Sequence, residues 1–269
     1  MLAGCSRLGI IDFLTPTSGY TRAAGIAYGA GPRQTLDLYK PVTPLPEHPV
    51  VVFFYGGSWN SGERGNYRFV AQALAQRGIL VVIADYRLYP QVRYPDFLKD
   101  NASAVAWVHV HVGEYGGNPQ QLFLMGHSSG AYNAAMLALD PPFLQAAGLS
   151  PTSIKGWIGL AGPYDFLPVE NREVRPVFFY PQSPPDSQPI NHVNAGSPPA
   201  LLLAASSDTF VDPVRNTGGL ARRLQEAGVP VRVRYFDRVD HASLVGAFAW
   251  PLRWLAPVTD EVVGFVQRP

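Results

Sequence analysis

The sequence predicts an α/β protein built on a mostly parallel, doubly wound sheet with helices on both faces. Short apolar runs alternate along the chain with segments that have the 3.6-residue periodicity of amphipathic helices. Strands that alternate with helices favour parallel pairing, because each helix carries the chain back across the sheet. Several runs are followed directly by polar residues, at the edge of the sheet where such proteins bind ligands.

The individual elements follow from runs and periodicity. Strands are expected over residues 35–39, 50–55, 79–84, 122–125, 156–162, 199–205 and 231–236. Helices are expected over residues 67–78, 96–111 and 214–227, and from residue 129 onward. Residues 166–198 are rich in Pro, Phe and Tyr and have no clean period. We expect them to form a short excursion, after the strand at 156–162, that walls a pocket.

Length and charge limit the classes of protein that this chain can be. It has 269 residues, enough for one large α/β domain with a sizeable core, and its formal net charge is +1. We expect an N-terminal arm over residues 1–34 and a single α/β domain over 35–269. Without a run of like charges there is no electrostatic argument for a nucleic acid partner. The sequence has no motif for a metal or a cofactor, and no apolar run of spanning length.

The single cysteine, Cys5, excludes an internal disulfide and a cysteine-based metal site. Residues 2–5 resemble the lipobox at which bacterial lipoproteins are cleaved and lipidated, although the charged and apolar leader expected ahead of it is missing from this sequence. Two readings stay open: a lipid anchor at Cys5 that holds the protein at the bacterial cell envelope, or an incidental thiol in a cytoplasmic protein.

A Gly-x-Ser-x-Gly motif at residues 126–130 lies between an apolar run and a helix-forming stretch. Where a strand turns directly into a helix, Gly126 and Gly130 remove bulk that would otherwise clash. Ser128 is then held in a strained conformation with its hydroxyl exposed. The N–H of Ser129, at the helix start, points toward negative charge that forms near the Ser128 oxygen. We therefore expect Ser128 to be a nucleophile rather than part of an ordinary turn.

A serine nucleophile needs a neighbouring base, and six histidines are available. His241 alone follows the last expected strand, so we expect it to be the base; the alternative is that it only begins a helix. His127 adjoins Ser128, but neighbours at such a turn project apart, so we expect it to pack beneath the turn. The other histidines, at positions 48, 109, 111 and 192, fall in loops or in an expected helix.

The acid that orients the histidine has three candidates. A loop beside the last strand is best placed to reach the imidazole nitrogen that faces away from Ser128, which favours Asp208. Asp165, which follows the preceding strand, is the runner-up. Asp212 comes third, because it precedes Pro213 and is expected to cap the next helix. Asp240 cannot easily turn its carboxylate onto the adjacent ring.

The turn at residues 56–59 follows a buried strand and contains two glycines. Glycine lets the backbone approach a substrate carbonyl closely, so we expect the N–H groups of Gly57 and Ser58, together with that of Ser129, to form an oxyanion hole. Asp85 and Arg87 are expected to form a partly buried ion pair near the site. Four aromatic residues are candidate pocket walls: Trp59, Tyr164, Phe166 and Phe178.

The order of elements, the Gly-x-Ser-x-Gly turn and the turn at 56–59 resemble the α/β-hydrolase superfamily. The closest likeness is to its carboxylesterase branch, which includes hormone-sensitive-lipase-like and feruloyl-esterase-like enzymes. Segments 85–88, 94–95 and 162–166 are also similar, and the resemblance covers residues 35–269.

That resemblance implies hydrolysis of carboxylic esters through an acyl-enzyme on Ser128, without a cofactor, by a triad in the order Ser128, Asp208, His241. We expect a short acyl chain, because the excursion over 166–198 is too short for a large lipase lid and its Pro content indicates a fixed wall. Asp208 also matches the family's pattern of Asp followed three residues later by Val. Where the family usually has histidine before the glycine pair, this chain has Tyr55, which we expect to brace the loop through its hydroxyl. The alternatives are an amide or formamide hydrolase similar to kynurenine formamidase, and a non-catalytic binding protein.

Overall fold

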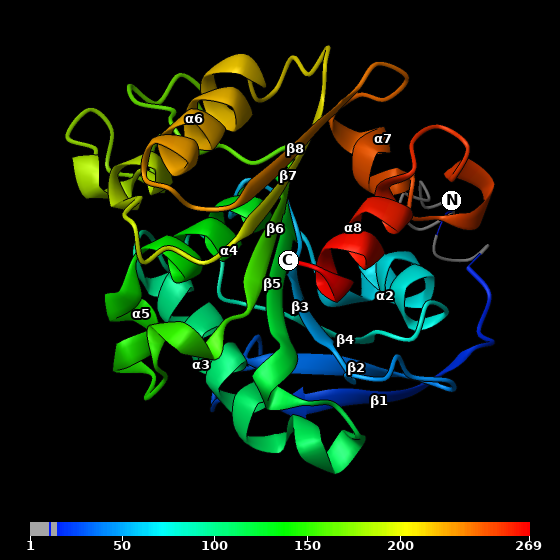
Figure 1. The fold of residues 1–269 in the computed structure, drawn as a ribbon. Coiled ribbons are helices and arrows are strands. Elements are labelled where there is room, and N and C mark those ends of the chain that lie inside the picture. Colours follow the sequence, from blue (N-terminus) through cyan, green and yellow to red (C-terminus); the bar gives the residue numbers. More distant parts are fainter. Residues whose placement is uncertain (1–10, 12–14) are drawn as a thin grey trace, which may run out of the picture.

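Eight strands form one sheet that is parallel except at one edge (Figure 1). The computed structural model describes Ile11 and residues 15–269. The strands are β1 (Tyr20–Ala27), β2 (Thr35–Pro41), β3 (Val50–Phe54), β4 (Leu80–Ala84), β5 (Leu122–His127), β6 (Gly156–Leu160), β7 (Ala200–Ala205) and β8 (Val231–Phe236). Their order across the sheet is β1-β2-β4-β3-β5-β6-β7-β8, and pairing is antiparallel only for β1 with β2 and β2 with β4. The predicted fold class is confirmed.

Helices cover both faces of the sheet, as Figure 1 shows. One face carries α3 (Asp96–His111), α4 (Ser129–Leu139), α5 (Pro141–Ala146) and α6 (Gly219–Glu226). The other face carries α2 (Arg68–Ala75), α7 (His241–Gly246) and α8 (Val258–Gln267). The strands β3 to β7 are buried throughout, because helices lie above and below them.

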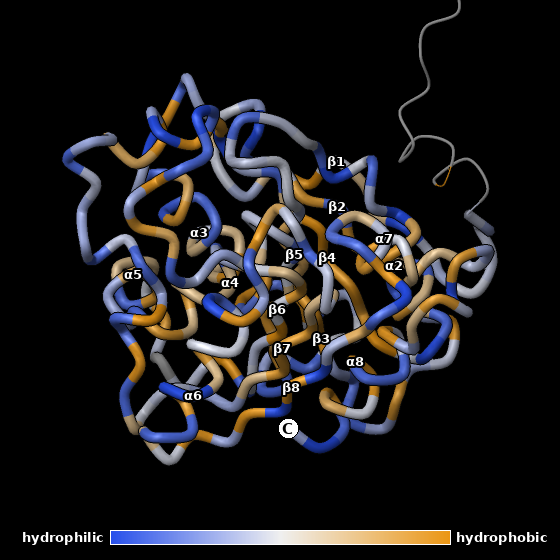
Figure 2. Tube along the Cα trace, turned by 90° about the horizontal axis from the view of Figure 1, so that it is seen from above, coloured by the Kyte–Doolittle hydropathy of each residue, from blue (hydrophilic) through white to orange (hydrophobic). Residues whose placement is uncertain are grey.

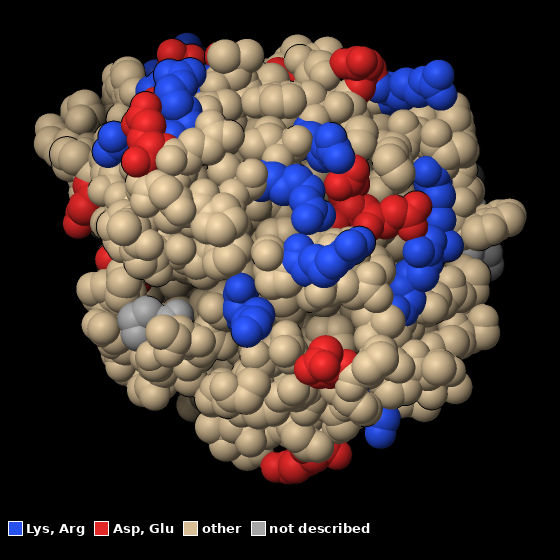
Figure 3. Space-filling view, in the orientation of Figure 1, with Lys and Arg blue, Asp and Glu red and all other residues tan. Residues whose placement is uncertain are grey.

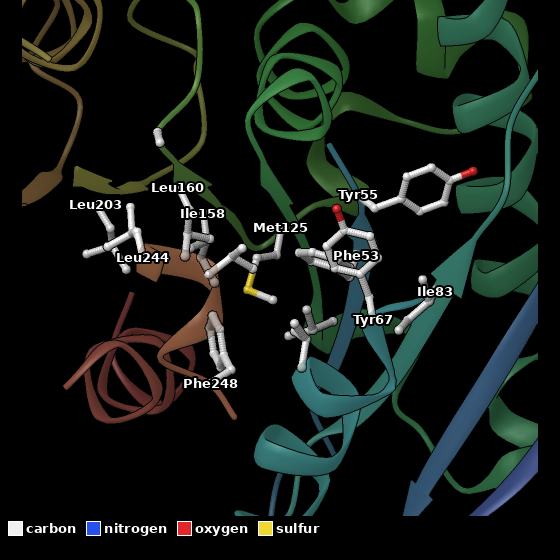
Figure 4. Packing of buried hydrophobic residues seen from close by; sticks show 14 of the residues in the cluster. Phe53, Tyr55, Tyr67, Ile83, Met125, Ile158, Leu160, Leu203, Leu244 and Phe248 are labelled. Carbon is white, nitrogen blue, oxygen red and sulfur yellow. The ribbon is translucent and has the colours of Figure 1, made fainter. Parts of the chain in front are cut away.

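Two apolar clusters, one on each face, hold the helices against the sheet. The cluster beneath α2, α7 and α8 contains Phe53, Met125 and Leu203 from three different strands, packed against Leu244 and Phe248 (Figure 4). The cluster beneath α3, α4 and α6 uses the alternate residues of the same strands. Seen from above, hydrophobic segments lie at the centre of the molecule and hydrophilic ones outside (Figure 2). Burial on both faces explains why these strands read as continuous apolar runs.

The structure departs from the sequence-based expectation in two elements. Strand β1 lies within residues 1–34, which we expected to form an arm, and it pairs with β2 at the edge of the sheet. Its side chains are half-buried or exposed, so it has no apolar run that could reveal it. The helix expected over 214–227 is divided into a π-helical turn, Val214–Gly218, and α6.

The order of the strands places a crevice at the boundary between β3 and β5. From β3 the chain passes through α2 to β4 on one side, and then returns through α3 to β5 on the other side. Connections that leave in opposite directions open a space above the carboxyl ends of the two strands. The turn at 56–59 and Ser128 both lie there, one after each strand.

Candidate active site

Ser128 lies in a sharp turn between β5 and α4 with φ 55° and ψ −124°, a backbone conformation that residues other than glycine rarely adopt. Its N–H donates to the carbonyl oxygen of Leu160 on the neighbouring strand, at 2.8 Å. A Cβ on Gly126 would lie 2.1 Å from the carbonyl oxygen of Gly130, and one on Gly130 would lie 2.0 Å from that of Phe54. The prediction that both glycines remove clashing bulk is confirmed, since neither position can accept a side chain.

A continuous chain of hydrogen bonds links Ser128, His241 and Asp208. The distance from Ser128 Oγ to His241 Nε2 is 2.9 Å, and from His241 Nδ1 to Asp208 Oδ2 it is 2.7 Å. The Asp208 carboxylate is 1% exposed and the His241 imidazole 15%, so solvent reaches the imidazole but not the carboxylate. These three residues follow β5, β7 and β8, and the sheet brings them together across more than 100 positions of sequence.

The carboxylate of Asp208 is held in its charged form. Burial by itself would raise its pKa, but the hydrogen bond and charge interaction with His241 oppose this, as do the N–H groups of Val211 and Phe210. Those N–H groups donate to Oδ1 at 3.0 and 2.8 Å. The net effect is a pKa below the ordinary value. One carboxylate oxygen is thus fixed by its own loop, and the other faces the imidazole.

The other candidate acids lie elsewhere. Asp165 forms a bidentate ion pair with Arg215, with both contacts at 3.1 Å. Asp212 accepts hydrogen bonds from the N–H groups at the start of the next helical turn, as expected of a capping residue. Asp240 caps α7 through the N–H and hydroxyl of Ser243, which turns its carboxylate away from the His241 ring. His241 is therefore both the first residue of a helix and the partner of Ser128.

The loop after β3, residues 55–63, lies against Ser128 at Gly56 and lines the same cavity. Gly57 has φ 138°, and a Cβ there would lie 2.3 Å from the carbonyl oxygen of Ser61. Ser58 and Trp59 also have positive φ, so three successive residues hold conformations that favour exposed backbone N–H groups. Trp59 anchors the loop through a 2.9 Å hydrogen bond from Nε1 to Asn133 on α4. On the other side, the N–H of Ser129 belongs to the first turn of α4, where it has no partner within the helix.

Tyr55 connects the β3 loop to a buried polar network. Its hydroxyl donates to Asp85 at 2.8 Å and accepts from Arg33 at 2.8 Å, while Arg33 also donates to the carbonyl oxygen of Gly62 at 2.7 Å. Burial, followed by the neighbouring Tyr86 and Asp85, raises the pKa of Tyr55, so the hydroxyl stays a neutral donor. The hydroxyl therefore braces the end of the loop through Arg33 rather than by touching the loop itself.

The expected ion pair between Asp85 and Arg87 is wrong. Arg87 pairs with Asp100 on α3, with Nη2 2.8 Å from Oδ1, and Asp85 pairs with Arg64. Although the two residues are close in sequence, the end of β4 sends their side chains to different elements. Asp85 faces the β3 loop and Arg87 faces α3.

The triad opens into a cavity of about 670 Å³. Trp59 and Phe166 line it as expected, together with Pro168, Val169 and Val174 of the excursion. Tyr164 and Phe178 were expected as walls, but both are fully buried and do not line the cavity. Phe178 packs edge-on behind Trp59, with ring centroids 4.9 Å apart. The ring of Tyr164 fills the space that glycine leaves at position 159.

Several lining residues escaped prediction from sequence. They include Asn66 and Tyr67 after the β3 loop, and Phe210 and Arg215 after Asp208. Phe210 is two positions after Asp208, and its ring centroid lies 5.4 Å from that of His241. The others lie on turns whose direction only the tertiary structure sets.

His127 packs beneath the turn, as expected, and it also contacts His241. Its Nε2 donates to the carbonyl oxygen of His241 at 2.9 Å. Burial, followed by repulsion from His241, lowers the pKa of His127 to about 3, so this imidazole is neutral. Other histidines contact nearby groups away from the cavity: Gly116, Glu114 and Asp186 are the partners of His48, His111 and His192.

The described part of the chain shows neither a metal site nor a membrane-spanning helix. Among Ile11 and residues 15–269, no group of three or more His, Cys, Asp or Glu side chains could hold a metal ion. Within the same residues, no helix has the length and apolar character needed to cross a bilayer. On the face drawn in Figure 3, basic side chains lie next to acidic ones. The lipobox-like segment and Cys5 lie outside the described residues.

Comparisons with known proteins agree with this geometry. The BD-FAE family model matches residues 36–224. A probable isoprenylcysteine alpha-carbonyl methylesterase of Arabidopsis thaliana is 29% identical over 91% of this chain and 55% of its own length. A probable carboxylic ester hydrolase, LipM of Mycobacterium tuberculosis, is 31% identical over 85% of this chain and 58% of its own. The chain thus spans little more than half the length of these curated relatives.

Among solved structures, esterase LipW of Mycobacterium marinum superposes with a TM-score of 0.77 at 25% identity, covering 97% of this chain and 86% of that one. A carbohydrate esterase from gut microbiota gives a TM-score of 0.76 at 16% identity, covering 94% of this chain and 98% of that one, a likeness of fold alone. With a family model that matches most of its length and with esterase neighbours of the same architecture, the chain belongs to the BD-FAE family of the α/β-hydrolase superfamily.

Proposed function

We propose that this protein is a serine carboxylesterase that hydrolyses short-chain carboxylic esters through an acyl-enzyme on Ser128. One observation carries the proposal: Ser128, His241 and Asp208 form a hydrogen-bonded chain, and Ser128, at one end of it, lines a cavity. Serine becomes a nucleophile when a base lies within hydrogen-bond reach and a third group orients that base. Several relatives are named esterase, carboxylic ester hydrolase or methylesterase, which favours an ester over an amide substrate.

In the first half of the proposed reaction, Ser128 Oγ attacks the ester carbonyl carbon while His241 Nε2 takes the hydroxyl proton. The negative charge on the carbonyl oxygen faces the N–H groups of Gly57, Ser58 and Ser129, at the positive end of α4. Asp208 stabilises the imidazolium and keeps Nδ1 protonated. The imidazolium then gives its proton to the alcohol oxygen, the bond from carbon to that oxygen breaks, and the alcohol leaves.

In the second half, water attacks the acyl carbon and His241 takes a proton from it. The same donors face the second oxyanion. When the bond to Ser128 Oγ breaks, His241 returns the proton to that oxygen, and the carboxylic acid is released. In the free protein, His241 already lies within hydrogen-bond distance of both Ser128 Oγ and the Asp208 carboxylate.

The proposal of a short acyl chain rests on the excursion. Phe166, Val169 and Val174 form one wall of the cavity, and the segment is tied to α4 by a 2.8 Å hydrogen bond from the Tyr132 hydroxyl to the Ser187 carbonyl oxygen. A wall that is fixed in this way limits the length of chain that the cavity accepts.

A series of p-nitrophenyl esters from acetate to dodecanoate tests the substrate class, together with a serine-directed phosphonate and mass spectrometry of the labelled peptide. We expect kcat/KM to be highest for acetate to butyrate and the label to lie on Ser128. Greater activity on long-chain triglyceride emulsions than on soluble acetates would contradict the short-chain proposal. Labelling at any other residue would contradict the choice of nucleophile.

A further inference from the structure

Phe210 is an exposed aromatic side chain that lines the active-site cavity. It is 81% exposed, more than any other large apolar residue of the described chain. Exposed apolar residues are common and need no explanation when they stand alone on a surface. Phe210 differs from Trp254, which is 71% exposed, because Trp254 does not line the cavity. An apolar side chain exposed inside the cavity can contact a substrate, whereas one exposed elsewhere on the surface cannot.

The loop that holds the acid also fixes Phe210. The N–H of Phe210 donates to Asp208 Oδ1 at 2.8 Å, so its backbone is part of the turn that positions the carboxylate. The ring centroid of Phe210 lies 5.4 Å from that of His241. Val211, the next residue, also lines the cavity. Phe210 is thus an apolar surface beside the imidazole, on a backbone that the triad itself holds in place.

The transfer of the proton from His241 determines which part of an ester lies beside Phe210. His241 Nε2 must come within about 3 Å of the alcohol oxygen in order to protonate it as it leaves. The carbons bonded to that oxygen then lie beside the His241 ring, within reach of an apolar neighbour that makes contacts at about 4 Å. The alcohol side of the ester is therefore the side that meets Phe210.

We propose that Phe210, with Val211, forms a subsite for an apolar or aromatic alcohol group, so that the enzyme prefers esters of such alcohols to esters of small alcohols. This inference rests on the proposed function, because it uses His241 as the proton donor. When the alcohol group binds, it covers the phenyl ring of Phe210. A larger apolar alcohol removes more apolar area from water and is therefore favoured. The Phe210 side chain is 81% exposed, so its ring is accessible in the free protein.

The test uses acetate esters of alcohols with similar acidity, so that only the size and apolar area of the leaving group vary. Hydrolysis of ethyl, butyl, hexyl and 2-phenylethyl acetate is followed by pH-stat titration. We expect kcat/KM to rise about tenfold from ethyl to 2-phenylethyl acetate in the native protein. In Phe210→Ala the rise should be lost, so that kcat/KM falls more for 2-phenylethyl acetate than for ethyl acetate. Phe210→Leu should keep part of it.

Trp254→Ala is the matched control, because it removes an exposed aromatic side chain outside the cavity. It should leave the whole series unchanged. Ethyl esters from acetate to butyrate form a second series, in which Phe210→Ala should leave the dependence on acyl length unchanged. A changed acyl dependence, or an equal loss on ethyl and 2-phenylethyl acetate, would overturn the subsite.

The two proposals fail in different ways. Ester hydrolysis with phosphonate labelling of Ser128, but with no dependence on the alcohol, would overturn the subsite and leave the esterase standing. If no ester is hydrolysed and Ser128 is not labelled, both are overturned.

Discussion

The imidazole of His127 donates a hydrogen bond from Nε2 to the backbone carbonyl oxygen of His241, with 2.9 Å between the two atoms. A carbonyl oxygen can only accept, so Nε2 carries the proton. The residue before Ser128 thereby holds the backbone of the residue that accepts the Ser128 hydroxyl proton in the proposed mechanism. This hydrogen bond therefore joins the turn that holds Ser128 directly to the start of α7, which holds His241.

His127→Ala should lower kcat by up to about 10², with a smaller change in KM, because displacement of His241 by about 1 Å misaligns the proton transfer. His127→Gln, which restores an N–H donor, should recover part of the activity. Steady-state kinetics on p-nitrophenyl acetate provide the measurement, and His111→Ala, at a half-buried position at the end of α3 and outside the cavity, is the control. A folded His127→Ala variant with unchanged kcat would show that the contact does not position His241.

The stability of the protein should fall on acidification because of the same residue. Burial, followed by repulsion from His241, lowers the pKa of His127 to about 3 from 6.5, so the unfolded state binds a proton that the folded state does not. This contribution is fully present above pH 6.5 and is lost as the pH falls from there toward 3. Between pH 6.5 and about 5 the loss is about 2 kcal/mol.

Urea unfolding at pH 7.5 and about pH 5 measures this effect. His127→Gln should show a smaller loss of unfolding free energy between the two conditions than the native protein. Asp208 adds to the trend at lower pH, since its lowered pKa makes its contribution disappear below the ordinary range of an aspartate. An equal pH dependence in His127→Gln and the native protein would refute the assignment.

Ser128→Ala should abolish ester hydrolysis without loss of stability. The hydroxyl contributes one hydrogen bond to His241 at the surface of the cavity, and the strained φ of 55° is set by the surrounding turn. Activity on p-nitrophenyl acetate and the thermal midpoint are measured together. Ser61→Ala, which removes another hydroxyl that lines the cavity, should retain turnover. Retained turnover in Ser128→Ala would rule out this serine as the nucleophile.

Asp208→Asn should lower kcat by about 10²–10⁴, because the amide keeps the shape but removes the charge that stabilises the imidazolium. Asp165→Asn and Asp212→Asn are matched controls with the same chemical change. They should lose far less, since one carboxylate pairs with Arg215 and the other caps a helical turn. An inactive Asp165→Asn beside an active Asp208→Asn would reverse the choice of acid.

Tyr55→Phe should weaken both stability and activity. Without the hydroxyl, Asp85 and Arg33 lose a buried partner, at a cost of about 1–3 kcal/mol in the free energy of unfolding. The end of the β3 loop loosens because Arg33 also holds Gly62, so kcat should fall more than KM rises. Urea unfolding and steady-state kinetics measure the two effects, with Tyr235→Phe, at an exposed position of β8, as the control. Unchanged kinetics in the folded variant would show that Tyr55 does not brace the loop.

The sequence by itself determined the fold class and the three residues proposed for the triad. Continuous apolar runs mark strands covered on both faces, and the polar residues directly after them must gather at one edge of a parallel sheet. Gly126 and Gly130 could be recognised because a strand that turns directly into a helix leaves no space for a side chain. These are local constraints, and a local pattern is enough to identify them.

The tertiary structure alone decided the contacts that depend on direction. Asp85 and Arg87 are two positions apart, yet they pair with Arg64 and Asp100, because the chain is irregular after the end of β4 and only the tertiary structure sets the direction of each side chain. Strand β1 has one neighbour and a solvated face, so its sequence carries no apolar signal. The contact between His127 and His241 joins residues 114 positions apart, and only the packing of α7 above the end of β5 brings them within a hydrogen bond.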